Sequence, residues 1–189
     1  MSAANGPALL LIDVQHGLDE PHFGVRNNPD AEQRIAELLA AWRAAGKPVI
    51  HVQHMSTEPD SPLRPGAPGN AIKPEAAPRG GEPLFQKTVN GAFVDTGLQD
   101  HLRAEGIEEL VVVGLTTDHC VSTTVRMADN LGFGVTVVFD ATATHDRTGP
   151  DGTHYTADQM HELGLASLHG EFARVRSATE VLASLLSSA

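Results

Sequence analysis

Short apolar runs recur along the chain, and longer segments with an apolar residue every three to four positions lie between them. A continuous apolar run is typical of a strand buried on both faces, and the longer spacing is typical of an amphipathic helix. The runs predict strands at residues 8–14, 48–52, 84–87, 109–114, 135–139 and 172–175. Because the two kinds of segment alternate, we predict a parallel sheet with helices on both faces.

Capping residues mark where several of the predicted helices begin. Asn28 is predicted as the N-cap of the first helix. Thr156 with Gln159, and Ser177 with Glu180, have the spacing of a capping box and predict the starts of the last two helices. The other predicted helices span residues 96–104 and 118–131.

The chain has 189 residues, which suits one domain with a sizeable core. We therefore predict a single domain over residues 1–189, with a three-layer α/β/α, Rossmann-like architecture around a six-stranded, mainly parallel sheet. Residues 55–83 contain seven prolines and show no periodicity. They predict a long loop that serves the function of the protein or contacts another subunit.

Charge and composition exclude several classes of partner. The formal net charge of −11 argues against binding to nucleic acid or to an anionic membrane surface. The single cysteine cannot form a disulfide within the chain, and the first residues lack a basic signal-peptide region, so we expect a cytoplasmic protein. The chain has ten histidines but no His-Glu-x-x-His and no Cys-x-x-Cys motif, so we expect no metal site.

Residues with reactive side chains follow the predicted strands. Asp13 follows the first strand, Lys87 ends the third, and Cys120 lies shortly after the fourth. Because the carboxyl ends of parallel strands meet at one edge of a sheet, we expect the three side chains to share a cleft. Cys120 also lies near the start of a predicted helix, whose positive end favours a thiolate. Taken singly, an inert buried cysteine, a solvated lysine and an aspartate that caps a turn stay open as alternatives.

Three segments in this order resemble the isochorismatase-like cysteine hydrolase superfamily. They are Asp13-x-Gln15, Lys87 followed by Ala92-Phe93, and Gly114-x-Thr-Thr-x-x-Cys120-Val121. The superfamily includes nicotinamidases, other small amidohydrolases and isochorismatases. The resemblance extends over residues 8–181, nearly the whole chain.

The resemblance implies roles for individual residues. Asp13, Lys87 and Cys120 match the catalytic triad of the superfamily. A cis peptide bond is implied between Leu115 and Thr116, and the backbone N–H groups of Thr116 and Cys120 are implied to form an oxyanion hole. Candidate substrate-binding residues are Gln15, His54, Asn90, Phe93 and His119.

Two departures from the superfamily pattern bear on the substrate. Many relatives have a serine shortly before the Ala-Phe pair, where this chain has Asn90. The Asp-x-His metal pattern of nicotinamidases is absent after the second strand, which disfavours a metal-dependent nicotinamidase. Cys120 itself favours acyl transfer, because hydrolysis of a vinyl ether, as in isochorismatases, does not need a thiol nucleophile.

The sequence therefore predicts a cysteine-dependent hydrolase that cleaves a small carboxamide or ureido C–N bond through a thioester, without a cofactor. One alternative is an isochorismatase-type hydrolase that acts on a vinyl ether. Another is a non-catalytic protein that uses the thiol for binding or redox sensing, and a third is a scaffold that has lost activity. The expected partners are a small-molecule substrate and further copies of the chain, in a dimer or tetramer.

Overall fold

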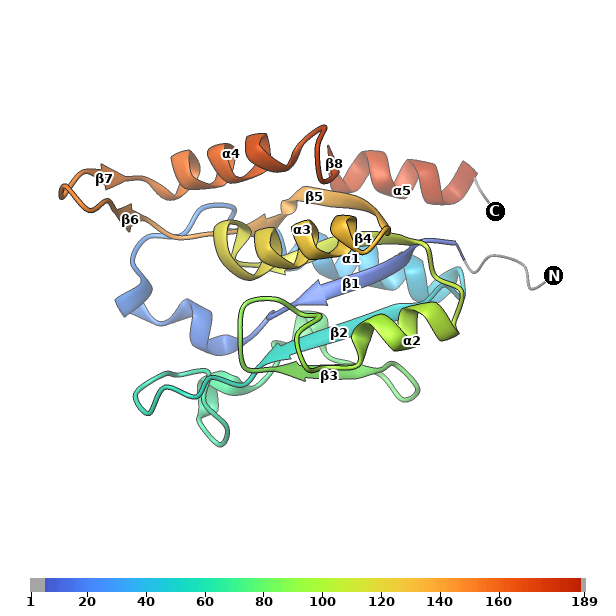
Figure 1. The fold of residues 1–189 in the computed structure, drawn as a ribbon, viewed down its shortest axis with the longest axis horizontal. Helices are drawn as coiled ribbons and strands as arrows, with labels where there is room; N and C mark the ends of the chain where they lie inside the picture. Colours follow the sequence, from blue (N-terminus) through green and yellow to red (C-terminus); the bar gives the residue numbers. More distant parts are fainter. Residues whose placement is uncertain (1–5, 188–189) are drawn as a thin grey trace.

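The computed structural model describes residues 6–187. Six strands form one sheet in the order β3-β2-β1-β4-β5-β8 (Figure 1). All neighbouring pairs in it are parallel. The strands are β1 (Ala8–Ile12), β2 (Val49–His54), β3 (Leu84–Lys87), β4 (Glu109–Leu115), β5 (Gly134–Ala143) and β8 (Arg174–Arg176). The predicted six-stranded parallel sheet is confirmed.

Helices cover both faces of this sheet. They are α1 (Ala31–Ala44), α2 (Leu98–Ala104), α3 (Ser122–Asn130), α4 (Ala157–Leu168) and α5 (Ala178–Ser187). Apolar side chains of α2, α3 and α4 share one core cluster, and those of α1 and α5 share another. The three-layer α/β/α architecture of a single domain follows from these two clusters. No helix in the described part of the chain has both the length and the apolar character that crossing a bilayer requires.

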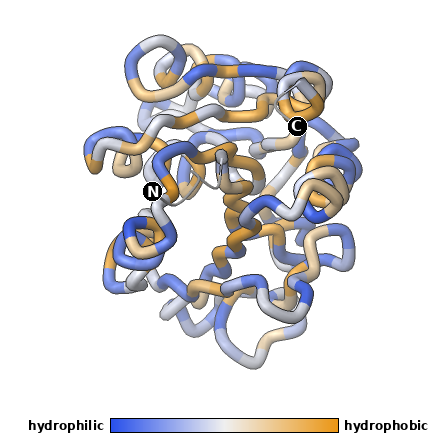
Figure 2. The backbone as a smooth tube through the Cα atoms, turned by 90° about the vertical axis from the view of Figure 1, so that its right-hand side faces the viewer, coloured by the Kyte–Doolittle hydropathy of each residue, from blue (hydrophilic) through white to orange (hydrophobic). Residues whose placement is uncertain are grey.

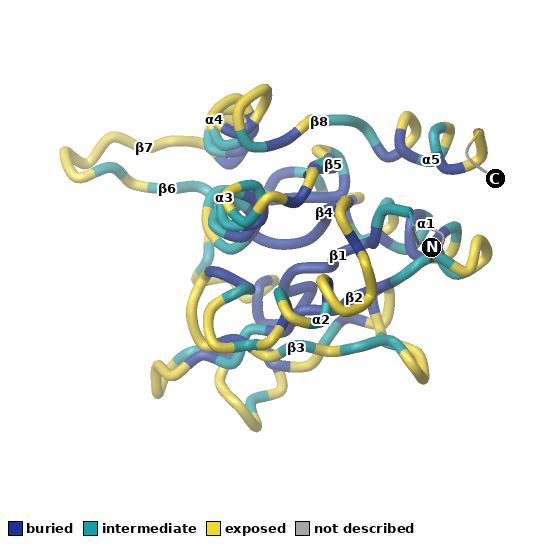
Figure 3. The backbone as a smooth tube through the Cα atoms, turned by 45° about the vertical axis from the view of Figure 1, so that its right-hand side comes forward, coloured by how far each residue is buried: buried dark blue, intermediate teal, exposed yellow. Residues whose placement is uncertain are grey.

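The central strand β1 contributes to both core clusters. Leu10 and Ile12 pack with α2 and α3, whereas Leu9 and Leu11 pack with α1. Successive side chains of a strand point to opposite faces, so a strand covered on both sides must be apolar throughout. The apolar strands lie at the centre of the molecule (Figure 2), where they are buried (Figure 3). This double burial explains the unbroken apolar run in the sequence.

Some predicted boundaries differ from the structure. Helix α1 begins at Ala31 with Asp30 as its N-cap residue, so the prediction that Asn28 caps it is wrong. Asn28 has φ of 43°, and its side-chain amide donates to the carbonyl oxygens of Phe139 (2.9 Å) and Thr142 (2.7 Å). The side chain therefore binds the distant strand β5 in place of its own helix.

Both predicted capping boxes are confirmed. Thr156 Oγ1 accepts a hydrogen bond from the Gln159 N–H, and Gln159 Oε1 accepts one from the Thr156 N–H. Ser177 and Glu180 exchange the same pair of bonds at the start of α5. These bonds satisfy N–H groups that have no partner within the helix.

Residues 55–83 form the predicted long loop, which contains two 3₁₀ turns, Pro68–Asn70 and Pro74–Ala76. The side-chain amide of Asn70 donates to the carbonyl oxygens of Leu63 (2.6 Å) and His54 (2.9 Å). The loop is thereby bound to the end of β2. An antiparallel hairpin, β6 (Arg147–Thr148) and β7 (His154–Tyr155), projects from the sheet on the left of Figure 1.

Candidate active site

The carboxyl ends of three strands bring Asp13, Lys87 and Cys120 together. Asp13 follows β1, Lys87 is the last residue of β3, and Cys120 lies in a π-helical turn that follows β4. Lys87 Nζ donates to Asp13 Oδ2 (2.6 Å) and to Cys120 Sγ (3.3 Å), and it lies 3.0 Å from His54 Nδ1. The structure thus brings the three side chains together at one edge of the sheet, as expected.

The Asp13–Lys87 ion pair is shielded from solvent. The side chains of Lys87 and Asp13 are 0% and 2% exposed. Asp13 Oδ1 is buried and has no hydrogen-bond donor among the described residues, whereas Oδ2 accepts from the Lys87 ammonium. A carboxylate oxygen of Asp13 lies within 4.8 Å of Cys120 Sγ. The carboxylate therefore lies near the thiol and keeps one oxygen, Oδ1, available as an acceptor.

Cys120 is a thiol at neutral pH. Burial raises its pKa most, the negative charge of Asp13 raises it further, and the charge of Lys87 opposes both, with a resulting pKa of about 12. The position near a helix start suggests a thiolate, but burial and the adjacent carboxylate outweigh that effect. A reaction at this sulfur therefore needs a base at the moment of attack.

Atoms of Asp13, His54 and Cys120 lie within 4.8 Å of one another, a spacing that could hold a metal ion. The Lys87 ammonium, however, lies within 3.3 Å of an atom of each of these three residues. Burial and the charge of Lys87 lower the pKa of His54, so its ring is neutral and accepts from the ammonium. The ammonium thus supplies positive charge to the same three residues.

The backbone around Cys120 has an unusual path. Gly114 has φ of 118°, and a Cβ there would collide with the carbonyl oxygen of Ile12, so only glycine fits. The next peptide bond, between Leu115 and Thr116, is cis. The Thr116 carbonyl then accepts from the N–H of both His119 and Val121 at 3.2 Å. Together these features start the turn that presents Cys120 at the sheet edge.

Side chains on either side of Cys120 anchor the turn. Thr117 Oγ1 lies 2.8 Å from His161 Nδ1 on α4. Asp118 accepts hydrogen bonds from Arg147 Nε (2.9 Å) and from Thr144 Oγ1 (2.5 Å). Burial raises the pKa of Asp118, but the bond from Thr144 and the charges of His119 and Arg147 outweigh it and hold the pKa below its ordinary value. Asp118 is therefore ionised at neutral pH.

A cavity of about 370 Å³ opens beside Cys120. Its lining residues are Asp13, Leu18, Phe23, His54, Ser61, Leu63, Asn90, Leu115, Thr116, His119, Cys120 and Arg147. Asn90 Oδ1 lies 3.7 Å from Cys120 Sγ, near the limit for a thiol hydrogen bond. Of the five residues expected to contact substrate, the structure places three at the cavity: His54, Asn90 and His119.

The other two, Gln15 and Phe93, are not among the residues that line the cavity. The fully buried side chain of Gln15 donates to the carbonyl oxygens of His54 and Asn70 and accepts from the His54 N–H. Its amide therefore joins β2 to the long loop. Phe93 stacks on Phe133 with ring centroids 5.9 Å apart and packs against the core cluster under α2 and α3.

Several cavity residues escaped the sequence analysis because no local pattern marks them. Leu18 and Phe23 come from the 3₁₀ turns after β1, and Leu63 comes from the long loop. Arg147, the first residue of β6, lines the cavity and donates a hydrogen bond to Asp118. For Leu63 the sequence did offer a signal, because the prolines of residues 55–83 mark its loop as a candidate functional segment.

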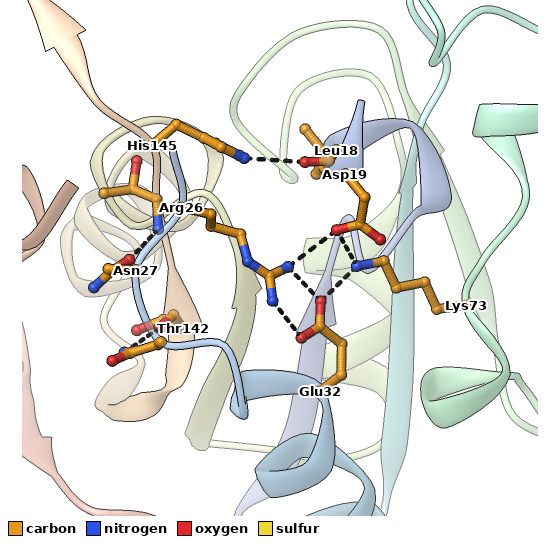
Figure 4. Close-up of polar contacts among 10 residues, drawn as sticks. Leu18, Asp19, Arg26, Asn27, Glu32, Lys73, Thr142 and His145 are labelled. Carbon is orange, nitrogen blue, oxygen red and sulfur yellow. Dashed lines mark hydrogen bonds and ion pairs between the residues drawn. The ribbon is translucent and has the colours of Figure 1, made fainter. Parts of the chain in front are cut away.

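A polar cluster holds the Leu18 side of the cavity in place (Figure 4). We define the Glu32 cluster as Asp19, Arg26, Glu32 and Lys73. Glu32 accepts from Lys73 Nζ (2.5 Å) and, through both carboxylate oxygens, from Arg26 (2.6 and 2.7 Å). Asp19, next to Leu18, accepts from Lys73 (2.7 Å) and from Arg26 (3.2 Å). The cluster ties α1 and the long loop to the segment that lines the cavity.

Replacing Glu32 with glutamine is expected to lower the free energy of unfolding by about 3 kcal/mol at neutral pH. Burial raises the pKa of Glu32, but the bonds and charges of Arg26 and Lys73 outweigh it and lower the pKa from 4.5 to about 2. Because the pKa of Glu32 is lower in the folded protein than in the unfolded chain, its charge stabilises the fold fully at pH values above 4.5. This contribution is lost as the pH falls from 4.5 towards 2. The difference between wild type and Glu32→Gln should thus shrink to about 1 kcal/mol at pH 3.

Urea unfolding at both pH values measures this effect. The control is Glu37→Gln on the same helix, because the pair of Glu37 with Arg34 is exposed and should contribute no more than about 0.5 kcal/mol. Equal losses for Glu32→Gln and Glu37→Gln would contradict a structural role of the Glu32 cluster.

Comparison with known proteins places this chain in a family. Residues 7–180 match the family model described as "Isochorismatase domain". The chain is 41% identical over 175 residues to the isochorismatase family protein YrdC of Bacillus subtilis, which covers 93% of this chain and 94% of YrdC. It is 30% identical over 186 residues to the ureidoacrylate amidohydrolase RutB of Methylobacterium radiotolerans, with 79% and 70% of the two chains covered.

A solved structure extends the likeness to three dimensions. A hydrolase of the isochorismatase family from Chromobacterium violaceum superposes with a TM-score of 0.94 at 49% identity, covering 99% of this chain and 96% of that one. The match of the family model to nearly the whole chain agrees with the resemblance seen in the three sequence segments. The chain therefore belongs to the isochorismatase family of hydrolases.

Proposed function

We propose that this chain hydrolyses the C–N bond of small carboxamides or ureido compounds through a thioester on Cys120. The observation that supports this most is the Lys87 ammonium, which contacts both a buried Asp13 carboxylate and Cys120 Sγ beside a cavity. A base, a cation and a nucleophile within hydrogen-bonding reach are the requirement for covalent catalysis by a cysteine.

In the proposed first step the Cys120 sulfur attacks the substrate carbonyl carbon while the thiol proton moves to Asp13. The free acceptor oxygen of Asp13 suits this role, and the high pKa of Cys120 makes the proton transfer necessary. The C–N bond then breaks, Asp13 returns the proton to the leaving nitrogen, and ammonia or an amine departs. The product of this step is an acyl thioester on Cys120.

In the proposed second step water attacks the thioester. Asp13, again a carboxylate, accepts a proton from the water as the oxygen bonds to the carbonyl carbon. The carbon–sulfur bond breaks, the sulfur regains a proton from Asp13, and the acid product leaves. Lys87 keeps Asp13 oriented through both steps, because it donates to the oxygen that does not exchange protons.

The backbone N–H groups of Thr116 and Cys120 are the proposed oxyanion hole. The place of both residues in the cavity wall supports this assignment, since Thr116 precedes and Cys120 lies within the π-helical turn that follows β4. Each such donor typically contributes about 10²–10³-fold in rate. His54, Asn90 and His119 line the same cavity and are the proposed substrate contacts. We also propose that neither a metal nor an organic cofactor takes part.

An amide substrate is favoured over a vinyl ether for two reasons. The reactive thiol stands at the cavity beside a base, and acyl transfer uses such a thiol. The similar protein RutB is named for the hydrolysis of an amide, that of ureidoacrylate.

We also propose that the active form contains further copies of the chain, in a dimer or tetramer.

Ammonia release from a panel of small carboxamides and ureido compounds tests the proposal, with and without a chelator. Turnover that persists in the chelator, with an acyl adduct on Cys120 detected by mass spectrometry after rapid quenching, is the expected result. Turnover without any adduct, or turnover lost on chelation and restored by a metal, would contradict the proposed chemistry.

A further inference from the structure

A cluster of apolar side chains forms part of the wall of the cavity beside Cys120. Leu18, Phe23, Leu63 and Leu115 all line it, from four separate segments of the chain. Three of them, Leu18, Leu63 and Leu115, are buried in the core cluster that Phe23 covers. The cavity volume of about 370 Å³ is near the small end of the range for ligand sites, which suits a small molecule. Such walls gain most from an apolar group on the substrate.

The guanidinium and the buried carboxylate on the cavity wall, Arg147 and Asp13, are each paired with a group of opposite charge. Arg147 is paired with Asp118, which its Nε and Nη2 reach at 2.9 and 3.3 Å. His119 also lies beside Asp118, at 3.6 Å. Asp13 is paired with Lys87 behind the wall, and His54 is neutral because burial and Lys87 lower its pKa. A negatively charged substrate would therefore find no free cation among the residues that line the cavity.

A carboxylate would be opposed by two further effects. Transfer of a carboxylate from water to a partly apolar site is costly unless a charged partner is supplied. The chain also has a formal net charge of −11, so its field repels an approaching anion. Both effects disfavour a carboxylate substrate, as does the pairing of Arg147 with Asp118.

We infer that the cavity selects uncharged substrates with an apolar acyl or ureido substituent and rejects those that carry a carboxylate. This inference deepens the proposed function and rests on it for the reaction, because it names the substrate class of the same site. Asp118 is the residue that sets the selectivity, since it neutralises the one guanidinium that lines the cavity. Arg147 then anchors the turn that carries Cys120, through Asp118, and does not bind the substrate.

A matched pair of amides tests the inference. Succinamate and isocaproamide have the same chain length and number of non-hydrogen atoms, and differ in that an isopropyl group replaces the carboxylate. We expect kcat/KM of the wild-type protein to be at least about tenfold higher for isocaproamide, a difference of about 1.4 kcal/mol. Calorimetric titration of the Cys120→Ala variant should give a dissociation constant for isocaproamide lower by a similar factor.

The two measurements separate the inference from the proposed function. Equal or better turnover and binding of succinamate would overturn the inference and leave the amide chemistry standing. Tighter binding of isocaproamide without turnover of any amide would uphold the selectivity of the cavity and overturn the proposed reaction.

A substitution tests the cause of the selectivity. Asp118→Asn keeps an acceptor for Thr144 but releases the charge of Arg147, so the ratio of succinamate to isocaproamide turnover should rise about tenfold. The ratio within one variant cancels any general loss of activity. Glu37→Gln makes the same charge change on an exposed site and should leave the ratio unaltered. An unaltered ratio in Asp118→Asn would overturn the role assigned to that residue.

Discussion

Replacing Cys120 with alanine is expected to lower kcat for amide hydrolysis by about 10⁴-fold or more, because the variant cannot form the thioester. The loss should appear in kcat with every amide that the wild type cleaves. Cys120 is only partly buried, so removal of one sulfur should change the free energy of unfolding by no more than about 1 kcal/mol. Ammonia release and urea unfolding of the same preparation measure the two effects.

A matched control for this variant is Ser122→Ala, two residues further along the same helical segment. The Ser122 hydroxyl accepts one long hydrogen bond, at 3.4 Å from Arg126 Nε, and it does not line the cavity. Its activity should equal that of the wild type. Full amide turnover by Cys120→Ala would refute the nucleophile assignment, and retained turnover of a vinyl ether alone would favour the isochorismatase-type alternative.

Replacing Asp13 with asparagine is expected to affect both activity and stability. The substitution removes the proposed base, for which a loss of about 10²–10⁴-fold in kcat is typical. It also leaves the fully buried Lys87 ammonium without its counter-charge, which typically costs about 3–5 kcal/mol of unfolding free energy. The sequence alone predicts the catalytic loss, whereas the stability loss follows from the burial of the pair.

A double substitution separates these two effects. Lys87→Met in the Asp13→Asn background removes the unpaired charge and should recover most of the lost unfolding free energy. Activity should remain lost, because both the base and the cation beside Cys120 are absent. Recovery of activity together with stability would show that Asp13 acts only by keeping the fold intact, and would contradict its role as a base.

The sheet could be predicted from the sequence because its strands are covered on both faces. Every residue of β1 from Ala8 to Ile12 is buried, so the requirement for apolar residues is continuous and visible in the sequence. Element ends were less predictable. Asn28 has the residue type of an N-cap, yet its amide binds β5, more than a hundred residues away. No local pattern contains such a contact.

The meeting of Asp13, Lys87 and Cys120 could also be predicted, since parallel strands align their carboxyl ends. Gln15 and Phe93 lie near these residues in sequence but make other contacts, one with the long loop and one with the core. Arg147 lies far from them in sequence but lines the cavity. Distance in sequence from Asp13, Lys87 or Cys120 is therefore a poor guide to which residues line the cavity.

The sequence by itself determined the parallel sheet, the order of its helices and the reactive residues at its edge, because strand burial and chain alternation leave local patterns. Only the tertiary structure decided the state of those residues. The pKa of Cys120 depends on burial and on Asp13, which is distant in sequence. The neutral character of the cavity depends on the pairing of Arg147 with Asp118. Electrostatic energies follow distances in space and access to water, and these exist only once the chain has folded.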